Sequence, residues 1–163
     1  MTIDAPIERW RENILPEWCD YNGHMNVAFY VLVFDHATDS LWDTLGIGLE
    51  YRERTGHSTF TVEAHITYDR EVKEGEEVRC ATHLLGFDDK RIHYFHRMYH
   101  AVDGYVAATT EILAVHVDLS IRRVVPIPDD IRARLAAVMD AHRGLGVPDE
   151  AGRVIAMGRR RKS

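Results

Sequence analysis

Three side chains that can move protons or hold charge stand within five residues of one another: Asp20, Asn22 and His24. A carboxylate can attack a carbonyl carbon or activate a water molecule, and an amide or imidazole can orient that water. A helix-like apolar pattern follows at once, and the free amides at a helix N-terminus stabilise an oxygen that gains negative charge. The cluster therefore predicts chemistry in which an oxygen becomes anionic.

The same residue types also have ordinary structural roles. Asp and Asn side chains close turns and cap helices, which is the alternative interpretation of Asp20, Asn22 and His24. Spacing alone leaves capping and catalysis both open. The two roles are compatible for Asn22 and Asn26, either of which can be the N-cap of the helix.

Length, charge and cysteine content restrict the class of protein. A chain of 163 residues with 45% hydrophobic residues predicts one globular domain, and a formal net charge of -6 argues against nucleic-acid binding. No apolar run is long enough for a membrane span. The two cysteines, Cys19 and Cys80, are expected to be free thiols in a cytoplasmic protein. His96 and His100 share a strand face that His93 does not, so we expect no metal, and no other cofactor.

The elements that must position the cluster follow from hydrophobic periodicity. Apolar residues recur at three- and four-residue steps from Val27 to Leu45, and Gly46 suits the left-handed position after a helix. The period then changes to two, which predicts a strand with one apolar face. That face contains Phe60, Val62, Ala64, Ile66 and Tyr68.

Further alternation and turn signals predict a meander of antiparallel strands. The expected strands are 9–15 before the helix and roughly 78–87, 91–101 and 105–118 after the first long strand, with a short helix at 128–142. We expect residues 1–143 to form the domain and residues 144–163, which end in GRRRKS, to form a flexible basic tail.

One long helix cannot cover both faces of such a sheet. A second copy of the chain is the obvious cover for the other face, which predicts a homodimer or a dimer of dimers with active sites at the subunit interface. Glu63, His65, His93 and Arg97 are placed on this second face by the alternation.

The stretch from Trp18 to Leu45, with the strands behind it, resembles the hotdog-fold acyl-CoA thioesterases of the 4-hydroxybenzoyl-CoA thioesterase type. The resemblance covers roughly residues 8–140 in element order, and DYNGHMN (Asp20–Asn26) carries it at motif level. It implies an α+β hotdog fold, in which an antiparallel β-sheet wraps a long central helix. It also implies hydrolysis of a small acyl-CoA thioester to the free acid and coenzyme A.

The resemblance also assigns roles at the start of the helix. In that family the carboxylate just before the central helix is catalytic, and Asp20 holds this position. The D-x-N-x-H spacing is similar to the catalytic run of acyl-carrier-protein thioesterases of the same fold, which implies catalytic roles for Asn22 and His24 as well. A backbone amide at the helix start, that of Asn26 or Val27, would polarise the thioester carbonyl.

Two further runs, PEWCDYNGHMNVAFY and RRVVPIP, are similar to the thioesterase segments fused to, or encoded beside, carnitine dehydrogenases. This similarity implies betainyl-CoA, a cationic acyl thioester of carnitine breakdown, as the substrate. A quaternary ammonium is held by aromatic faces or by a carboxylate. The candidates are Trp18, Tyr21, Phe29, Tyr30, Tyr68 and Glu63.

Coenzyme A carries phosphates, so a basic patch is expected near the cleft. Lys90 and Arg91 at a strand start and Arg122 after the last long strand are the candidates, with ordinary solvated charge as the alternative for each.

Two other functions remain open. Hotdog enoyl-CoA hydratases use a D-x-N-P-x-H run, but here Gly23 replaces the proline and His24 comes one residue earlier, which misplaces the imidazole for that reaction. A hotdog sheet can also bind an acyl-CoA without turning it over. The carboxylate at position 20 argues against a pure binding module.

Overall fold

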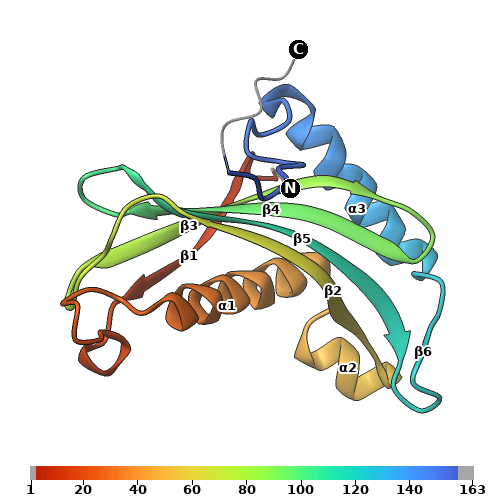
Figure 1. The fold of residues 1–163 in the computed structure, drawn as a ribbon. Coiled ribbons are helices and arrows are strands. Elements are labelled where there is room, and N and C mark those ends of the chain that lie inside the picture. Colours follow the sequence, from red (N-terminus) through yellow and green to blue (C-terminus); the bar gives the residue numbers. More distant parts are fainter. Residues whose placement is uncertain (1–2, 158–163) are drawn as a thin grey trace.

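A computed structural model describes residues 3–157, in which a curled antiparallel sheet holds a long helix in its hollow (Figure 1). The strands run in the order β1-β3-β4-β5-β2, and β6 pairs with β5. None of the helices in the described residues is long and apolar enough to cross a membrane. The strands are β1 (Ile7–Asn13), β2 (His57–Tyr68), β3 (Glu77–Phe87), β4 (Arg91–His100), β5 (Val106–Asp118) and β6 (Arg123–Val124). The helices are α1 (Val27–Leu45), α2 (Leu49–Thr55) and α3 (Asp129–His142), with 3-10 turns at Pro16–Trp18 and Arg143–Leu145.

Helix α1 confirms the helix expected from Val27 to Leu45. Asn26 is its N-cap and Gly46 ends it in the left-handed conformation, with φ of 72°. The buried face of α1 packs against the inner face of the sheet. Arg134 of α3 donates to the carbonyl of Leu45 at 3.1 Å, which satisfies one of the free acceptors at the C-terminal end of α1.

A bulge changes which side chains of β2 face α1. The register with β5 shifts between Thr61 and Glu63, so Thr61 precedes the extra residue and Ala64 follows it on the same, inner face. The sequence predicted one continuous apolar face for residues 59–68. This prediction is wrong for the residues that precede the bulge, because Phe60 points to the outer face and is exposed. Strict alternation cannot reveal a bulge, because one inserted residue inverts the pattern.

Two elements were not expected from the sequence. Helix α2 is too short for its periodicity to be distinguished from a turn, although Gly48 and Gly56 flank it as caps. The two residues of β6 pair with the end of β5 and return the chain toward α3.

Helix α3 covers the part of β3 that β1 leaves unpaired. β1 pairs with β3 only as far as Thr82, and beyond it the Leu84 amide donates to His142 Nδ1 at 3.0 Å. Nε2 of the same ring donates to the carbonyl of Asp4 at 3.1 Å. An acceptor at Nδ1 and a donor at Nε2 describe a neutral imidazole, and burial lowers the pKa of His142 in agreement.

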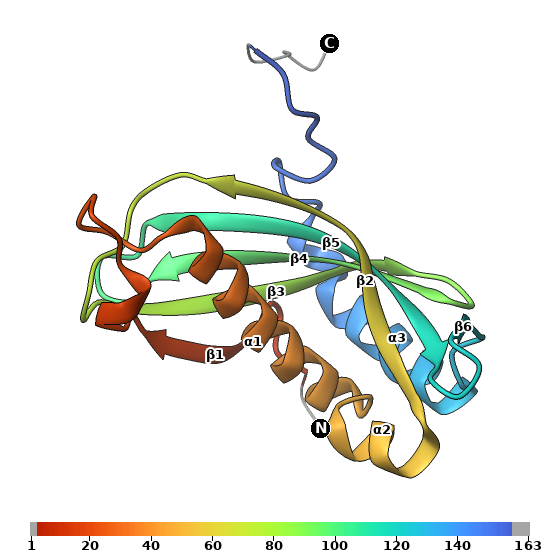
Figure 2. The ribbon, with the colours of Figure 1, turned by 60° about the horizontal axis from the view of Figure 1, so that its bottom comes forward.

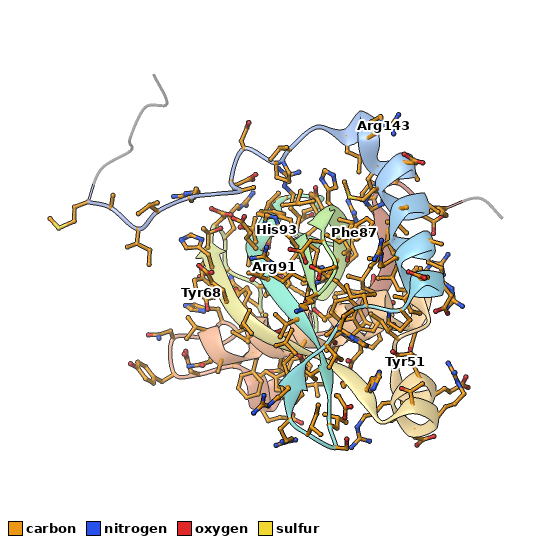
Figure 3. The ribbon with its side chains drawn as sticks, turned by 90° about the vertical axis from the view of Figure 1, so that its right-hand side faces the viewer. Tyr51, Tyr68, Phe87, Arg91, His93 and Arg143 are labelled. Atoms are coloured by element: carbon orange, nitrogen blue, oxygen red, sulfur yellow. The ribbon has the colours of Figure 1, made fainter. Side chains whose placement is uncertain are left out.

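The outer face of the sheet carries polar side chains, as expected, and the chain itself covers part of it. Arg97 of β4 donates to Glu150 at 2.6 Å, and Glu111 of β5 accepts from the Gly152 amide at 2.6 Å and lies 2.8 Å from His93 Nε2. His93 is labelled on this face in Figure 3. Residues 145–152 thus contact the sheet, whereas the GRRRKS run at 158–163 lies outside the described residues. The division of the chain at residue 143 stays a prediction.

The fully buried His96 is expected to make the stability of the protein depend on pH. Nε2 lies 2.9 Å from Thr38 Oγ1 and Nδ1 lies 2.8 Å from Thr82 Oγ1. Burial lowers the pKa of His96 to about 3. The unfolded chain takes up this proton near pH 6.5 and the folded chain does not, so acid favours unfolding. The contribution of His96 is complete above about pH 6.5 and declines toward pH 3, by up to about 1.4 kcal/mol per pH unit.

We expect His96→Gln to lower the free energy of unfolding at pH 7 and to reduce that deficit at pH 5, because the variant has no imidazole to protonate. Urea denaturation of both proteins at the two pH values measures the change, with His65→Gln on the outer face as the matched control. An equal deficit at pH 7 and pH 5 would contradict the prediction.

Candidate active site

The loop before α1 is held by main-chain hydrogen bonds. The Met25 amide donates to the carbonyl of Val72 at 2.8 Å, and the Asn26 amide donates to the carbonyl of Trp18 at 2.9 Å. Cys19 and Met25 form an isolated antiparallel bridge, which closes the loop on itself. The chain between them turns at Gly23, whose φ of 79° lies in the left-handed region that favours glycine. The three predicted catalytic residues are thus presented on a fixed loop.

Two hydrogen bonds hold the carboxylate of Asp20 in this loop. Its Oδ1 accepts from the Asn22 amide at 2.8 Å, and its Oδ2 accepts from Asn26 Nδ2 at 3.1 Å. These two donors, first that of Asn22 and then that of Asn26, lower the pKa of Asp20, and the nearby His24 acts in the same direction. The carboxylate is partly exposed and stays ionised at neutral pH.

Asn26 joins the helix cap to this carboxylate. Its Oδ1 accepts from the Ala28 amide at 3.0 Å while its Nδ2 donates to Asp20. Asn26 rather than Asn22 is therefore the N-cap, and because the same side chain also holds Asp20, capping does not exclude the catalytic interpretation. This use of the Asn26 side chain was not expected from the sequence, since residues six apart around a turn have no fixed geometry.

Of the two main-chain amides expected to polarise a carbonyl, only one is available. The Asn26 amide is occupied by the carbonyl of Trp18 and cannot serve, which corrects that expectation. The Val27 amide donates to no acceptor within residues 3–157, and Val27 is exposed. It is the free donor at the start of α1, where the helix dipole adds to its effect.

His24 and Asn22 lie beside Asp20 with different degrees of constraint. His24 is half-buried, and its Nδ1 donates to the carbonyl of Met25 at 3.1 Å, which leaves Nε2 as an acceptor in the neutral ring. The side chain of Asn22 is exposed, and its contribution to Asp20 comes through the main-chain amide.

Aromatic rings surround the start of α1. Trp18 is buried and stacks on Phe29 at 5.6 Å between centroids. Tyr30 is buried, accepts from the Val72 amide at 3.3 Å and meets the Tyr68 ring edge-on at 5.3 Å. The Tyr68 hydroxyl donates to the Val27 carbonyl at 3.4 Å, and half of this side chain is exposed (labelled in Figure 3). Tyr68 is thus the ring that borders the free Val27 amide, whereas Trp18 and Tyr30 belong to the core.

The remaining predicted binding residues lie elsewhere in the protomer. Glu63 is exposed on the outer face of β2, away from α1. Arg91 is paired with Asp88 at 2.6 Å in the β3–β4 turn, which lowers the pKa of Asp88 to about 2. Arg122 lies over the Phe60 ring at 5.9 Å, and Lys90 is exposed in the same turn as Asp88. The structure does not bring these four residues together with Asp20.

No group of three or more His, Cys, Asp or Glu side chains suited to a metal ion occurs within the described part of the chain. The chemistry available at the site is that of one ionised carboxylate, a free main-chain donor and the Nε2 atom of an imidazole. A carboxylate and an unpaired amide at the N-terminus of the helix that a curled antiparallel sheet holds are the groups that a hotdog-fold acyl-transfer enzyme requires.

The chain belongs to the Thioesterase-like superfamily, whose family model matches residues 14–135. The betainyl-CoA thioesterase of Pseudomonas aeruginosa is 45% identical over 144 residues, which cover 88% of this chain and 91% of that protein. The L-carnitine dehydrogenase/betainyl-CoA thioesterase of Rhizobium meliloti is 39% identical over 160 residues, which cover 97% of this chain and 32% of that longer protein.

Solved structures agree with the sequence comparisons. A Pseudomonas putida KT2440 structure, provisionally described as a thioesterase, is 36% identical and superposes with a TM-score of 0.81 over 94% of this chain and 98% of that chain. These similarities confirm the predicted hotdog fold and the predicted class of enzyme, an acyl-CoA thioesterase. They favour hydrolysis over the hydratase and binding-module alternatives.

The double role of Asn26 can be separated by substitution. Asn26→Ser keeps a side-chain oxygen to cap α1 but loses the donor to Asp20, so we expect the pKa of Asp20 to rise and the helix to keep most of its stability. The acid limb of the profile of kcat/KM against pH, measured by release of free thiol, should then move to higher pH. Asn26→Ala is the comparison and should also lose about 1 kcal/mol of stability. An acid limb at the same pH in all three proteins would refute the role of Nδ2.

Proposed function

We propose that this protein hydrolyses betainyl-CoA to betaine and coenzyme A, with Asp20 as the catalytic carboxylate. The observation that carries the proposal is that Asp20 is held ionised by the Asn22 amide and Asn26 Nδ2, at the turn that ends on the unpaired Val27 amide. The curated relatives named for betainyl-CoA cover most of this chain and support the choice of acyl group.

Each residue of the site has its own role in the proposed reaction. The Val27 amide donates to the thioester oxygen as it becomes anionic, and loss of such a donor typically costs about 3 kcal/mol. Asp20 either removes a proton from the attacking water or attacks the carbonyl carbon itself, forming an anhydride that water then opens. In the first route the water oxygen forms the new bond to the acyl carbon and Asp20 takes the proton, which then passes to the thiolate or to solvent. In the second route an Asp20 oxygen forms that bond, and water then opens the anhydride and restores the carboxylate. In both routes the carbon–sulfur bond breaks and the thiolate leaves with the bonding electrons. His24 Nε2 is placed to accept a hydrogen bond from the water.

We also propose that the active protein is a homodimer formed along β2. This strand is the edge of the sheet, and it pairs with β5 on one side only within the described residues. Val62 and Tyr68 are exposed on it, and a long apolar edge strand is a template for pairing with a second chain. Antiparallel pairing of the two β2 strands would extend the sheet across a two-fold axis and bring each Asp20 site to the interface.

A cytoplasmic location is proposed with the same substrate. Cys80 is buried, Cys19 is partly buried, and both are free thiols, as is usual in a reducing compartment.

Asp20→Asn keeps the shape of the side chain and removes its charge. We expect the rate of thiol release from betainyl-CoA to fall at least 100-fold, a loss of about 2.7 kcal/mol in transition-state stabilisation. The matched control is Asp129→Asn, because Asp129 lies at the start of α3 and its side chain is 99% exposed. A decrease of less than about threefold would contradict the role of Asp20.

Val62 is 56% exposed on the β2 edge, so a charge placed there should spare the protomer and disrupt the dimer. We expect Val62→Lys to halve the molar mass measured by light scattering after size exclusion. Val102→Lys is the control, since Val102 is 83% exposed in the β4–β5 turn and is not part of β2. A Val62→Lys protein with the mass of the wild type would exclude the β2 interface.

A further inference from the structure

A groove outside the Asp20 loop lies between α1, α2 and the first residues of β2. Its volume is about 690 Å³, and its walls include Asp35, Thr38, Asp39, Trp42, Asp43 and Thr61. The three carboxylates follow one another at four-residue steps, so they form a line along one face of α1. We call this feature the acidic groove.

The charge of the acidic groove is not balanced within the chain. None of the three carboxylates forms an ion pair within residues 3–157, although Arg52 of α2 also lines the groove. Burial raises the pKa of Asp39, and the neighbouring charges of Asp35 and Asp43 add to this effect. Three anionic groups that destabilise one another gain from a bound cation.

The hydroxyl of a buried tyrosine lies beneath the wall of the acidic groove. Tyr94 of β4 is 0% exposed, and its hydroxyl has no hydrogen-bond partner in the described residues. Burial raises the pKa of Tyr94 to about 12 and outweighs Thr38 and Thr61, which line the groove and act on this hydroxyl to lower its pKa. The Trp42 ring lies edge-on to the Tyr94 ring at 5.3 Å. The phenol thus adds a buried polar oxygen beneath the aromatic and acidic wall of the groove.

The position of the acidic groove relates it to the Asp20 site of a second protomer. α1 and β2 run antiparallel beside one another (Figure 2). The end of β2 meets the start of α1, where Tyr68 donates to the Val27 carbonyl at 3.4 Å, and the start of β2 meets Asp39 in the groove. A two-fold axis across the β2 edge sets the start of one β2 beside the end of the other. In such a dimer we expect each acidic groove to lie beside the start of the partner's α1.

We propose that the acidic groove of one protomer binds the quaternary ammonium of the acyl group held at Asp20 of the other. This inference rests on the proposed function and on the proposed β2 dimer. A trimethylammonium group has no N–H donors, so it is recognised by negative charge and by aromatic faces, which Asp39, Asp35 and Trp42 supply. The groove would thus distinguish a cationic acyl group from a neutral one of the same shape.

The test compares two thioesters of equal shape. Betainyl-CoA carries a trimethylammonium group, and 3,3-dimethylbutanoyl-CoA carries an uncharged tert-butyl group in its place. For the wild type, we expect kcat/KM for betainyl-CoA to exceed that for the neutral ester. Asp39→Asn should reduce the ratio of the two kcat/KM values at least tenfold, and Asp35→Asn should reduce it in the same direction. Asp129→Asn, which removes the same charge at a remote exposed site, should leave the ratio as in the wild type.

Two kinds of failure are distinguishable. If the wild type hydrolyses both esters equally well, or if Asp39→Asn lowers kcat/KM for both by the same factor, the ammonium site is refuted and the thioesterase assignment stands. If the wild type releases no thiol from either ester, or if Asp20→Asn leaves its rate intact, the proposed function fails and this inference fails with it.

Discussion

The site depends on one side chain that serves two purposes, the carboxamide of Asn26. Its oxygen satisfies an amide in the first turn of α1, and its nitrogen holds the carboxylate of Asp20. The direction in which the helix begins and the direction in which the acid points are therefore set together. Because the Asn26 amide is itself bound to the Trp18 carbonyl, the next donor along the chain, that of Val27, is the first one free to meet an anionic oxygen.

The central helix carries both the candidate reaction site and the acidic groove beside the proposed dimer interface. Its N-terminus supplies the donor, its buried face is held against the sheet, and its exposed face carries the acidic groove beside the β2 edge. A single protomer contains the groove and the Asp20 loop at opposite ends of the same helix. In the proposed dimer, two antiparallel copies would bring these two parts of α1 together, which would give a physical reason for the enzyme to work as a pair.

Much of this fold could be predicted from the sequence because its elements are long. Nineteen residues of helical period define α1, and alternation over ten or more residues defines β3, β4 and β5. Short or irregular features could not be predicted. The bulge in β2 inverts the alternation at Phe60, and the seven residues of α2 contain too few periods to be distinguished from a turn.

The candidate site was predictable in its residue types and less so in its contacts. Asp20 and Val27 follow from their places relative to the helix start. The donor role of Asn26 and the loss of its amide to Trp18 depend on how the loop closes, which spacing does not determine. Glu63 lies on the outer face of β2, as the alternation predicted, so its expected contact with the substrate would need a second protomer and stays a prediction.

The segment that crosses the outer face of the sheet has a practical consequence for the handling of this protein. Glu150 and Gly152 are anchored there by Arg97 and Glu111, on the side opposite α1. The anchors move from β4 at Glu150 to β5 at Gly152, so the segment runs across the sheet toward the β2 edge (Figure 2). A label attached near Gly152 would therefore lie on the side of the β2 edge, and measurements of subunit pairing are better made on a protein without one.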